Sequence, residues 1–401
     1  MKTKLLVSAI LLATAVVVYA WPMSSSPSAS APDIDLIAPN AESPESKPIV
    51  EVVFVLDTTG SMSGLIQAAK DNIWAIARSM ASAQPQPEIR VGLVAYRDRG
   101  DAYVTQVLDL STDLDSMYAS LMDFAASGGG DGPEAVNEAL YAAVHQIQWS
   151  QDPKAYQTIF LVGDAQPHMD YPDDVKFPVT LKAAAARGIV VNTVQAGNDP
   201  MTELAWQQIA QLSQGAHFKV GQGGDAIAVT TPYDEHMATL SKELDQTRLF
   251  YGDAAEQERA ASKVAATDKL SRSGSASTLA QRAAFNTSAS GGKNFLGENE
   301  LVEDVAQGRV DLAKLDSALL PEKLRDLSVT EKRKVIAQTQ GRREALKQEI
   351  AELAEKRQSY IEQELKKDAD VAQSLDYQIY GAVRAQAARK GLSYDEAAPA
   401  H

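Results

Sequence analysis

The stretch IVEVVFVLDTTGSMS, residues 49–63, decides how this chain folds. Residues 49–56 form a nearly unbroken run of β-branched and apolar side chains, which predicts a strand buried on both faces of a parallel sheet. A polar loop follows at residues 57–63, and apolar residues then recur at helical spacing from Ile66 to Met80. The pattern predicts a strand, a loop and a helix as the first unit of an α/β domain.

The same alternation continues downstream. Further strands are predicted at Ile89–Tyr96, Thr158–Val162, Ile189–Val194 and His217–Val220, with Tyr103–Val107 as a short antiparallel neighbour. Helices are predicted at Thr112–Ala125, Pro133–Trp149, Val179–Ala186 and Thr202–Leu212. Such alternation indicates a doubly wound, mainly parallel sheet covered by helices on both faces. A helix around Tyr233–Leu249 closes this domain, which we place at residues 49–250.

The amino-terminal segment has the composition of a targeting signal. Lys2 and Lys4 precede an apolar run, and small residues end at Ala20, which predicts a signal peptide at residues 1–20 and a secreted or periplasmic protein. The run is shorter than the ~20 residues that cross a bilayer. An uncleaved membrane anchor is the alternative. Residues 21–48, rich in Ser, Pro and Ala, are predicted to be a disordered linker.

The amino-acid pattern changes in the carboxyl-terminal part of the chain. Residues 251–300 contain Ser- and Gly-rich stretches and are predicted to be a low-complexity linker. Residues 301–392 are predicted to be helical, with a tail at residues 393–401. Ser328 and Glu331 form a capping box, and an apolar stripe follows at Leu346, Ile350, Leu353 and Tyr360. Arg357 interrupts this stripe, which is too short to define a coiled coil. We therefore expect a helical hairpin or small bundle that could self-associate.

Charge and cysteine content exclude several classes of function. The chain has 38 basic and 53 acidic residues, a net charge of −15, and no cysteine. Nucleic-acid binding needs concentrated Lys and Arg, so no nucleic-acid partner is expected. The absence of cysteine excludes disulfides, thiolate metal sites and cysteine nucleophiles. Divalent cations and cationic partners suit this composition better.

Three polar loops begin at or near the carboxyl-terminal edge of the predicted sheet, where open α/β sheets bind ligands. They are DTTGSMS at 57–63, GGGDGPE at 128–134 and VGDA at 162–165. Magnesium takes six oxygen ligands and keeps some waters. Hydroxyls of Thr59 and Ser61 can point the same way, and the carboxylates of Asp57 and Asp164 can bind directly or through water. Together the loops predict a hard-cation site, although each loop alone suits helix caps and turns.

The order of these loops resembles a known family. Asp57, Thr59 and Ser61 after an apolar strand match the D-x-[ST]-x-S signature of von Willebrand factor A-type domains. The stretch that ends at Asp131 and the strand-terminal Asp164 resemble the other loops of that family's metal-ion-dependent adhesion site. The third loop is similar to a version found in bacterial and some eukaryotic members. The resemblance covers about residues 47–250. It implies a six-stranded sheet and a bound Mg²⁺, Mn²⁺ or Ca²⁺ with one position left for a partner's carboxylate.

The second loop departs from the family pattern. The family's threonine hydroxyl aligns with Gly130, and the nearest oxygen donor is Asp131. The predicted metal ligands are therefore Asp57, Thr59, Ser61, Asp131 and Asp164. Three carboxylates around one divalent cation leave a net negative site, which disfavours capture of an incoming carboxylate. Ser63 is expected to cap the next helix rather than bind metal.

The other charged segments near this edge have plain structural interpretations. Residues 97–101, RDRGD, are expected to form a solvated turn, with partner recognition by its arginines as the alternative. The acidic loop at residues 168–174 is expected to be solvated rather than to bind a second cation. Trp149 and Trp206 are expected in the core.

Three functions stay open. We favour a cation-dependent protein-binding module of the cell envelope, of the adhesion or scaffold type and without enzymatic activity. The alternative is a structural or assembly protein in which the metal only stabilises the loops. A hydrolase that uses Asp57 and Asp164 is less favoured, because the sequence has no H-E-x-x-H, G-x-S-x-G or P-loop motif. Of the five histidines, only His168 is placed to act as a base.

Overall fold

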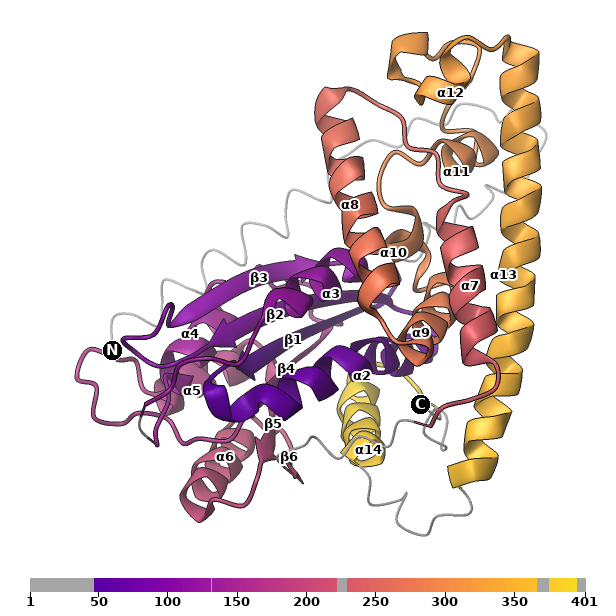
Figure 1. The fold of residues 1–401 in the computed structure, drawn as a ribbon. Coiled ribbons are helices and arrows are strands. Elements are labelled where there is room, and N and C mark those ends of the chain that lie inside the picture. The colour runs from indigo at the N-terminus through magenta and orange to yellow at the C-terminus, as the bar shows by residue number, and fades with distance from the viewer. Residues whose placement is uncertain (1–46, 131, 222–228, 366–374, 395–401) are drawn as a thin grey trace, which may run out of the picture. The chain divides into compact units, whose positions relative to one another are not determined.

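The computed structural model of this chain describes residues 47–130, 132–221, 229–365 and 375–394 (Figure 1). These residues belong to a single compact unit. The predicted signal peptide, residues 21–46 of the predicted linker and residues 395–401 of the tail lie outside the described residues.

A six-stranded sheet forms the centre of the amino-terminal domain. Its strands follow the order β3-β2-β1-β4-β5-β6, and every neighbouring pair is parallel except β2 and β3. The strands are β1 (Ile49–Asp57), β2 (Glu88–Tyr96), β3 (Thr105–Ser111), β4 (Tyr156–Gly163), β5 (Val190–Ala196) and β6 (His217–Val220). The prediction of a doubly wound, mainly parallel sheet is confirmed, including its antiparallel edge strand.

Helices cover both faces of the sheet. One layer consists of α4 (Val136–His145), α5 (Phe177–Ala186) and α6 (Pro200–Leu212). The other contains α2 (Ser63–Ala81), α3 (Leu114–Asp123) and α14 (Leu375–Ala388). Strand β1 is buried on both faces, because Val53 packs in the first layer and Val52 in the second. Trp149 and Trp206 lie in the first layer's core, as expected.

Residues 251–300 are helical, so the predicted low-complexity linker is wrong. They contain α8 (Ala254–Ser273), α9 (Ala276–Thr287) and α10 (Gly292–Leu296). Asp253 and Glu256 form a capping box at the start of α8, and the Ser275 side chain accepts a hydrogen bond from the Thr278 amide at the start of α9. The small polar residues therefore mark helix ends, where their side chains satisfy free backbone amides.

The remaining helices form a small bundle. They are α7 (Asp234–Asp245), α11 (Leu301–Ala306), the 3₁₀ turn η3 (Ser317–Leu319), α12 (Glu322–Arg325) and α13 (Val329–Leu365). The capping box predicted at Ser328 and Glu331 is present, with the Ser328 amide 2.9 Å from a Glu331 carboxylate oxygen. The long helix α13 contacts α7, α9 and α11 (Figure 1).

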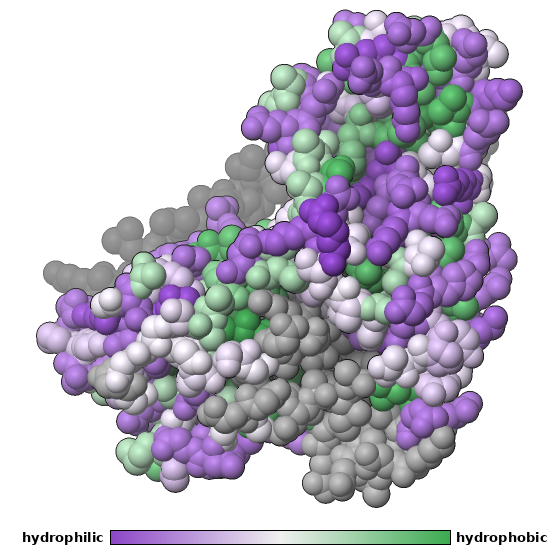
Figure 2. Space-filling view, viewed as in Figure 1, coloured by the Kyte–Doolittle hydropathy of each residue, from purple (hydrophilic) through white to green (hydrophobic). Residues whose placement is uncertain are grey.

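Arg357 does not interrupt the apolar stripe of α13, contrary to the expectation. Its side chain is fully buried on that stripe, where Nε donates to Asp234 over 2.8 Å. Ile350 and Leu346 on the same stripe pack against α7 and α9 inside the chain. Outside the stripe, hydrophilic side chains cover most of the helical region's surface in the view of Figure 2. The predicted apolar stripe is therefore buried by packing within the chain.

Helix α14 joins the sheet rather than the bundle, so the predicted 301–392 segment is not one separate domain. Oε1 of Gln386 accepts a hydrogen bond from the Tyr156 hydroxyl over 2.7 Å, and its Nε2 donates to Oδ1 of Asn192 over 2.8 Å. Within the described ranges, every helix lacks the length or the apolar character needed to cross a bilayer.

Candidate functional site at the sheet edge

The strand order places two of the three polar loops next to each other. Strand β1 lies between β2 and β4, so the chain leaves β1 toward one side of the sheet and returns on the other. Leu56 pairs with Val162 in parallel register, which puts Asp57 and Asp164 just beyond the same edge. This is the topological switch point, where open α/β sheets bind ligands.

The first loop gathers three of the predicted ligands. Asp57 is fully buried, and its Oδ1 accepts hydrogen bonds from the amide and the hydroxyl of Thr59 over 2.8 and 2.6 Å. The Thr59 hydroxyl lies 3.3 Å from the hydroxyl of Ser61. One carboxylate and two hydroxyls therefore form a continuous set of oxygens.

These oxygens do not cap the helices that follow. Thr59 precedes the 3₁₀ turn η2 (Gly60–Met62) without a capping hydrogen bond from its side chain. The residue at the cap position of α2 is Met62, and Ser63 is already the first helical residue. The expectation that Ser63 caps this helix is therefore wrong. The helix-cap interpretation does not account for the polar residues of the first loop.

The second loop is held against the first by backbone hydrogen bonds. The Ser127 amide donates to the Thr58 carbonyl, and the Gly60 amide donates to the Gly128 carbonyl, both over 3.1 Å. Gly128 has a positive φ of 81°, and a Cβ there would lie 2.4 Å from an Asp101 carboxylate oxygen, so only glycine fits. Asp131 lies outside the described residues, so its predicted role stays a prediction.

The third loop begins in close contact with Asp57. A Cβ on Gly163 would lie 3.0 Å from the Cβ of Asp57 and 2.5 Å from the Tyr96 hydroxyl, so the absence of a side chain lets β4 approach β1 here. Asp164 follows and is partly buried. Its carbonyl accepts a hydrogen bond from the Thr202 hydroxyl over 3.2 Å, which ties this loop to the start of α6.

Glu134, which was not among the predicted ligands, connects the second and third loops. Its amide donates to the Gln166 carbonyl over 2.9 Å, and its carbonyl accepts from the His168 amide over 3.1 Å. Its side chain is 4% exposed. The sequence signal was ambiguous, because an acidic residue just before a helix is common where it faces the positive end of the helix dipole.

The site holds more negative charge than its protein surroundings neutralise. Oδ2 of Asp57, Oε2 of Glu134 and the Tyr96 hydroxyl are buried without a hydrogen-bond partner in the described part of the chain. Burial and the charge of Asp164 raise the pKa of Asp57 to about 7, although hydrogen bonds from Thr59 lower it. Burial and the neighbouring aspartates, Asp57 first among them, raise the pKa of Glu134 to about 9. Burial and the same carboxylates raise the pKa of Tyr96 well above its ordinary value.

The described acidic and histidine side chains are not sufficient to form a complete metal site at this edge. In the ranges that the structure describes, no group of three or more His, Cys, Asp or Glu side chains could hold a metal ion. A cation at this edge would therefore need the hydroxyls of Thr59 and Ser61 and bound waters as well, which suits the coordination habits of Mg²⁺.

The segment at residues 97–101 is not a solvated turn. Arg97 and Asp98 are buried, and the Arg97 guanidinium lies 4.5 Å from the ring centre of Tyr103 and donates to the Ala125 carbonyl over 2.8 Å. The Ala125 carbonyl and the aromatic face of Tyr103 thus take the place of water around this arginine. The segment helps to hold the second loop, because Asp101 accepts a hydrogen bond from the Gly129 amide.

The acidic loop at residues 168–174 is engaged by protein groups. Arg99 pairs with Asp173 over 2.8 Å and stacks over Tyr171, while the Asn137 side chain donates to Asp174 over 3.0 Å. His168 lies 2.8 Å from Asp170. Side chains thus bind three carboxylates of this loop, which was expected to be solvated.

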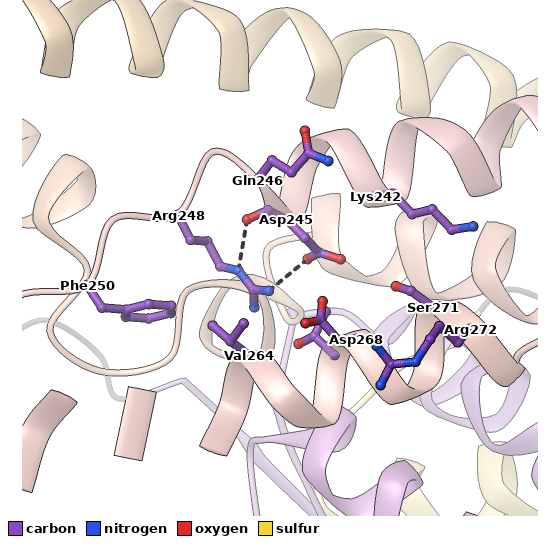
Figure 3. A pocket seen from close by; sticks show the side chains of 10 residues that line it. Lys242, Asp245, Gln246, Arg248, Phe250, Val264, Asp268, Ser271 and Arg272 are labelled. Carbon is purple, nitrogen blue, oxygen red and sulfur yellow. Dashed lines mark hydrogen bonds and ion pairs between the residues drawn. The ribbon is translucent and has the colours of Figure 1, made fainter. Parts of the chain in front are cut away.

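A cavity of about 460 Å³ lies elsewhere, between α7 and α8 (Figure 3). Its wall includes Lys242, Arg272 and Asp268, and Arg248 at its side is paired with Asp245 over 3.4 Å. No residue of the three loops lines it. The candidate functional site is therefore the sheet edge.

Comparison with known proteins agrees with this architecture. The family model of the von Willebrand factor A domain matches residues 51–222. The chain is 34% identical over 120 residues to von Willebrand factor A domain-containing protein 7 of Mus musculus, and 33% identical over the same length to that of Homo sapiens. Each match covers 30% of this chain and 12% of the relative. This chain therefore contains a von Willebrand factor A domain, within residues 51–222.

Proposed function

We propose that the domain is a divalent-cation-dependent protein-binding module whose cation sits at the sheet edge. Asp57, Thr59, Ser61 and Asp164 would hold Mg²⁺, Mn²⁺ or Ca²⁺, with Asp131 as a further predicted ligand. The observation that carries this proposal is the fully buried Asp57, which has one oxygen bound to Thr59 and the other without a partner in the described residues. A buried carboxylate is stable when it is paired or binds a metal.

The fit to a hard cation follows from the type and position of the donors. Carboxylate and hydroxyl oxygens are the ligands that Mg²⁺ and Ca²⁺ prefer. The first loop supplies both kinds within hydrogen-bond distance of each other. When bound, the cation would supply a positive charge that attracts an oxygen of the partner protein. The side chains of the loops would hold the cation at the edge of the sheet, and the exposed Ser61 places this edge within reach of a partner.

A purely stabilising role for the metal is the second candidate. The carboxylates around the edge raise one another's pKa values, and they are all ionised only when a cation offsets their mutual repulsion. A site that stays negative after one divalent cation binds attracts a partner's carboxylate weakly. This observation favours neutral or cationic groups on the partner if a partner binds there. We propose no enzymatic activity.

The cellular location is also a proposal. The composition of residues 1–20 supports export to the periplasm or beyond, with an uncleaved anchor as the alternative. Mass spectrometry of the protein from its native cells tests this directly. An amino terminus at Trp21 supports export with cleavage, whereas an intact Met1 contradicts it.

Calorimetric titration of the full chain with Mg²⁺ and Mn²⁺ tests the cation site. We expect wild type to bind one cation and to melt at a higher temperature in its presence. Asp57→Asn should abolish both effects, because it removes the central carboxylate. Asp268→Asn is the matched control, since Asp268 is exposed on α8 and outside the loops. Equal responses from wild type and Asp57→Asn would refute the cation site.

Affinity capture with and without EDTA separates the two roles of the metal. Wild type and Asp57→Asn are used as bait in an extract of the native cells. If a partner is retained only by wild type with Mg²⁺ present, the binding module is supported. If capture ignores EDTA while the melting temperature drops, the metal is a stabilising element only.

A further inference from the structure

The second loop has no side chain at the position where the family pattern predicts a hydroxyl. Gly130 is that residue, and among the described residues, its chain neighbours left aside, no heavy atom lies within 4 Å of where its Cβ would be. Backbone hydrogen bonds nevertheless hold this loop against the first one. A group from further along the second loop must therefore face the cation site if this loop contributes to it.

The backbone of Glu134 is fixed between the loops. Both its amide and its carbonyl bond to the third loop, at Gln166 and His168, and its carbonyl also accepts from the amide of Val136 over 2.8 Å. This last bond leads directly into α4. These three hydrogen bonds fix the backbone from which the side chain extends.

The carboxyl group of Glu134 points toward the first loop across a glycine. A Cβ on Gly129 would lie 3.0 Å from Oε1 of Glu134 and 3.2 Å from the Cβ of Thr59. Gly129 also has a positive φ of 75°. The missing side chain at Gly129 therefore leaves the space in which the Glu134 carboxyl and the Thr59 side chain face each other.

No protein cation among the described residues neutralises this carboxyl. Oε2 of Glu134 has no hydrogen-bond partner there, although the side chain is only 4% exposed. The largest charge effects on it come from acidic groups, namely Asp57, Asp98, Asp101 and Asp164. Glu138, one turn later on α4, differs in this respect, because it pairs with Arg99 over 2.6 Å. A buried carboxyl group among other carboxyl groups is stable when it is protonated or lies next to a positive charge, and a cation bound at the loops would supply that charge.

We propose that Glu134 supplies the second loop's contribution to the cation, through a water molecule bound to the ion, in place of the threonine of the family pattern. The proposal rests on the cation-binding function proposed above. A water-mediated contact is indicated because no three acidic or histidine side chains of the described residues could hold a metal together. Mg²⁺ commonly keeps several waters, and a carboxylate that accepts hydrogen bonds from them orients the coordination shell.

Mn²⁺ titration calorimetry of four variants tests this inference. Glu134→Gln should weaken Mn²⁺ affinity by about ten- to a hundredfold, the usual effect of losing a partner that orients metal ligands. Asp131→Asn separates the two candidates on the second loop: the inference expects a smaller loss of affinity than for Glu134→Gln, whereas a direct Asp131 ligand would give the larger loss. Glu138→Gln is the matched control: it removes one negative charge from the first turn of α4, just after Glu134, and should stay within about threefold of wild type. Asp57→Asn should abolish binding.

Melting curves in EDTA show whether each variant is folded, and an unfolded Glu134→Gln would be replaced by Glu134→Asp, which keeps the charge but shortens the reach. The inference is overturned if Asp57→Asn abolishes binding while Glu134→Gln binds like wild type, or if Asp131→Asn shows the larger loss. If wild type itself binds no cation, the proposed function fails as well. The two failures are therefore distinguishable.

Discussion

Two regions of the molecule bury carboxylates in opposite ways. Where the helical bundle meets the sheet domain, Asp115 pairs with Arg282 over 2.6 Å, and both side chains are fully buried. Arg343–Glu300 and Arg357–Asp234 repeat this arrangement on α13, over 2.9 and 2.8 Å. At the sheet edge, Asp57 and Glu134 are equally buried but face other carboxylates. Buried acids with arginine partners join elements of the fold, whereas those at the sheet edge suit a cation from outside.

The pKa values of the two regions move in opposite directions for this reason. Burial opposes the ionisation of Asp115, but the charge and hydrogen bonds of Arg282 outweigh it and hold its pKa well below the usual range. Asp57 has no such partner, so burial dominates and raises its pKa to about 7. Burial of an ionised carboxylate is unfavourable in both regions. With an arginine partner the acid stays charged, and without one it is readily protonated.

Removal of Arg282 should have the largest effect on stability. Arg282→Met would leave Asp115 and Asp245 buried without their shared cation, and we expect a loss of about 3–5 kcal/mol in the free energy of unfolding. Urea denaturation followed by circular dichroism measures this loss.

Arg342→Met is the matched control, because the Arg342–Glu243 pair is exposed on both sides. Its loss should be below ~1 kcal/mol. Equal losses for the two variants would show that the buried network does not hold the bundle to the domain.

The two regions should also give opposite slopes of stability against pH. The folded-state pKa of Asp115 lies below its unfolded value, so its contribution is complete above about pH 4 and is lost as the pH falls further. Asp57 and Glu134 have raised pKa values in the folded state. The folded protein then binds more protons than the unfolded chain from about pH 4 up to about pH 7 for Asp57 and about pH 9 for Glu134, so stability falls as pH rises through this range.

Melting temperatures across this pH range, in EDTA and in saturating Mg²⁺, measure both slopes. A bound cation would favour the ionised carboxylates, so Mg²⁺ should remove most of the decline at neutral pH and leave the acid limb unchanged. An identical decline with and without Mg²⁺ would contradict the cation site.

The central strand and the first loop of the site could be predicted from the sequence, because both depend on local patterns. The apolar run at residues 49–56 predicted the central strand, and the loop after it predicted Asp57, Thr59 and Ser61 as neighbours, which the structure confirms. Strand order then places Asp164 beside them, since β1 and β4 are adjacent.

Pairings across long sequence distances were not accessible. Arg357 looked like a break in an apolar stripe because its partner Asp234 lies 123 positions earlier in the chain. Serine-rich stretches at residues 251–300 looked like a linker, although Ser275 caps α9 and neighbouring apolar residues are buried. Glu134 was missed because its importance depends on which carboxylates the fold brings around it.

The same substitution should change stability in opposite directions in the two regions. In EDTA at mildly alkaline pH, Asp57→Asn relieves repulsion with neighbouring carboxylates and should stabilise the protein by about 1 kcal/mol. Asp115→Asn removes the anion that Arg282 needs and should destabilise it. Thermal unfolding of both variants gives the comparison, and a destabilising Asp57→Asn would place Asp57 among the structural acids.

The smallest expected effect concerns two serines that lie two positions apart. Ser61 reaches the Thr59 hydroxyl over 3.3 Å, whereas Ser63 begins α2 without a capping role. Ser61→Ala should weaken Mn²⁺ binding by about fivefold, because a water can replace the lost hydroxyl only in part. Ser63→Ala should leave both affinity and melting temperature unchanged. Calorimetry on the two variants shows whether Ser61 binds the cation specifically or whether any polar residue of the first loop contributes equally. A larger loss for Ser63→Ala would mean that Ser63 binds the cation in place of Ser61. The ligand set on which the contrast between the sheet edge and the helical interface depends would then be wrong.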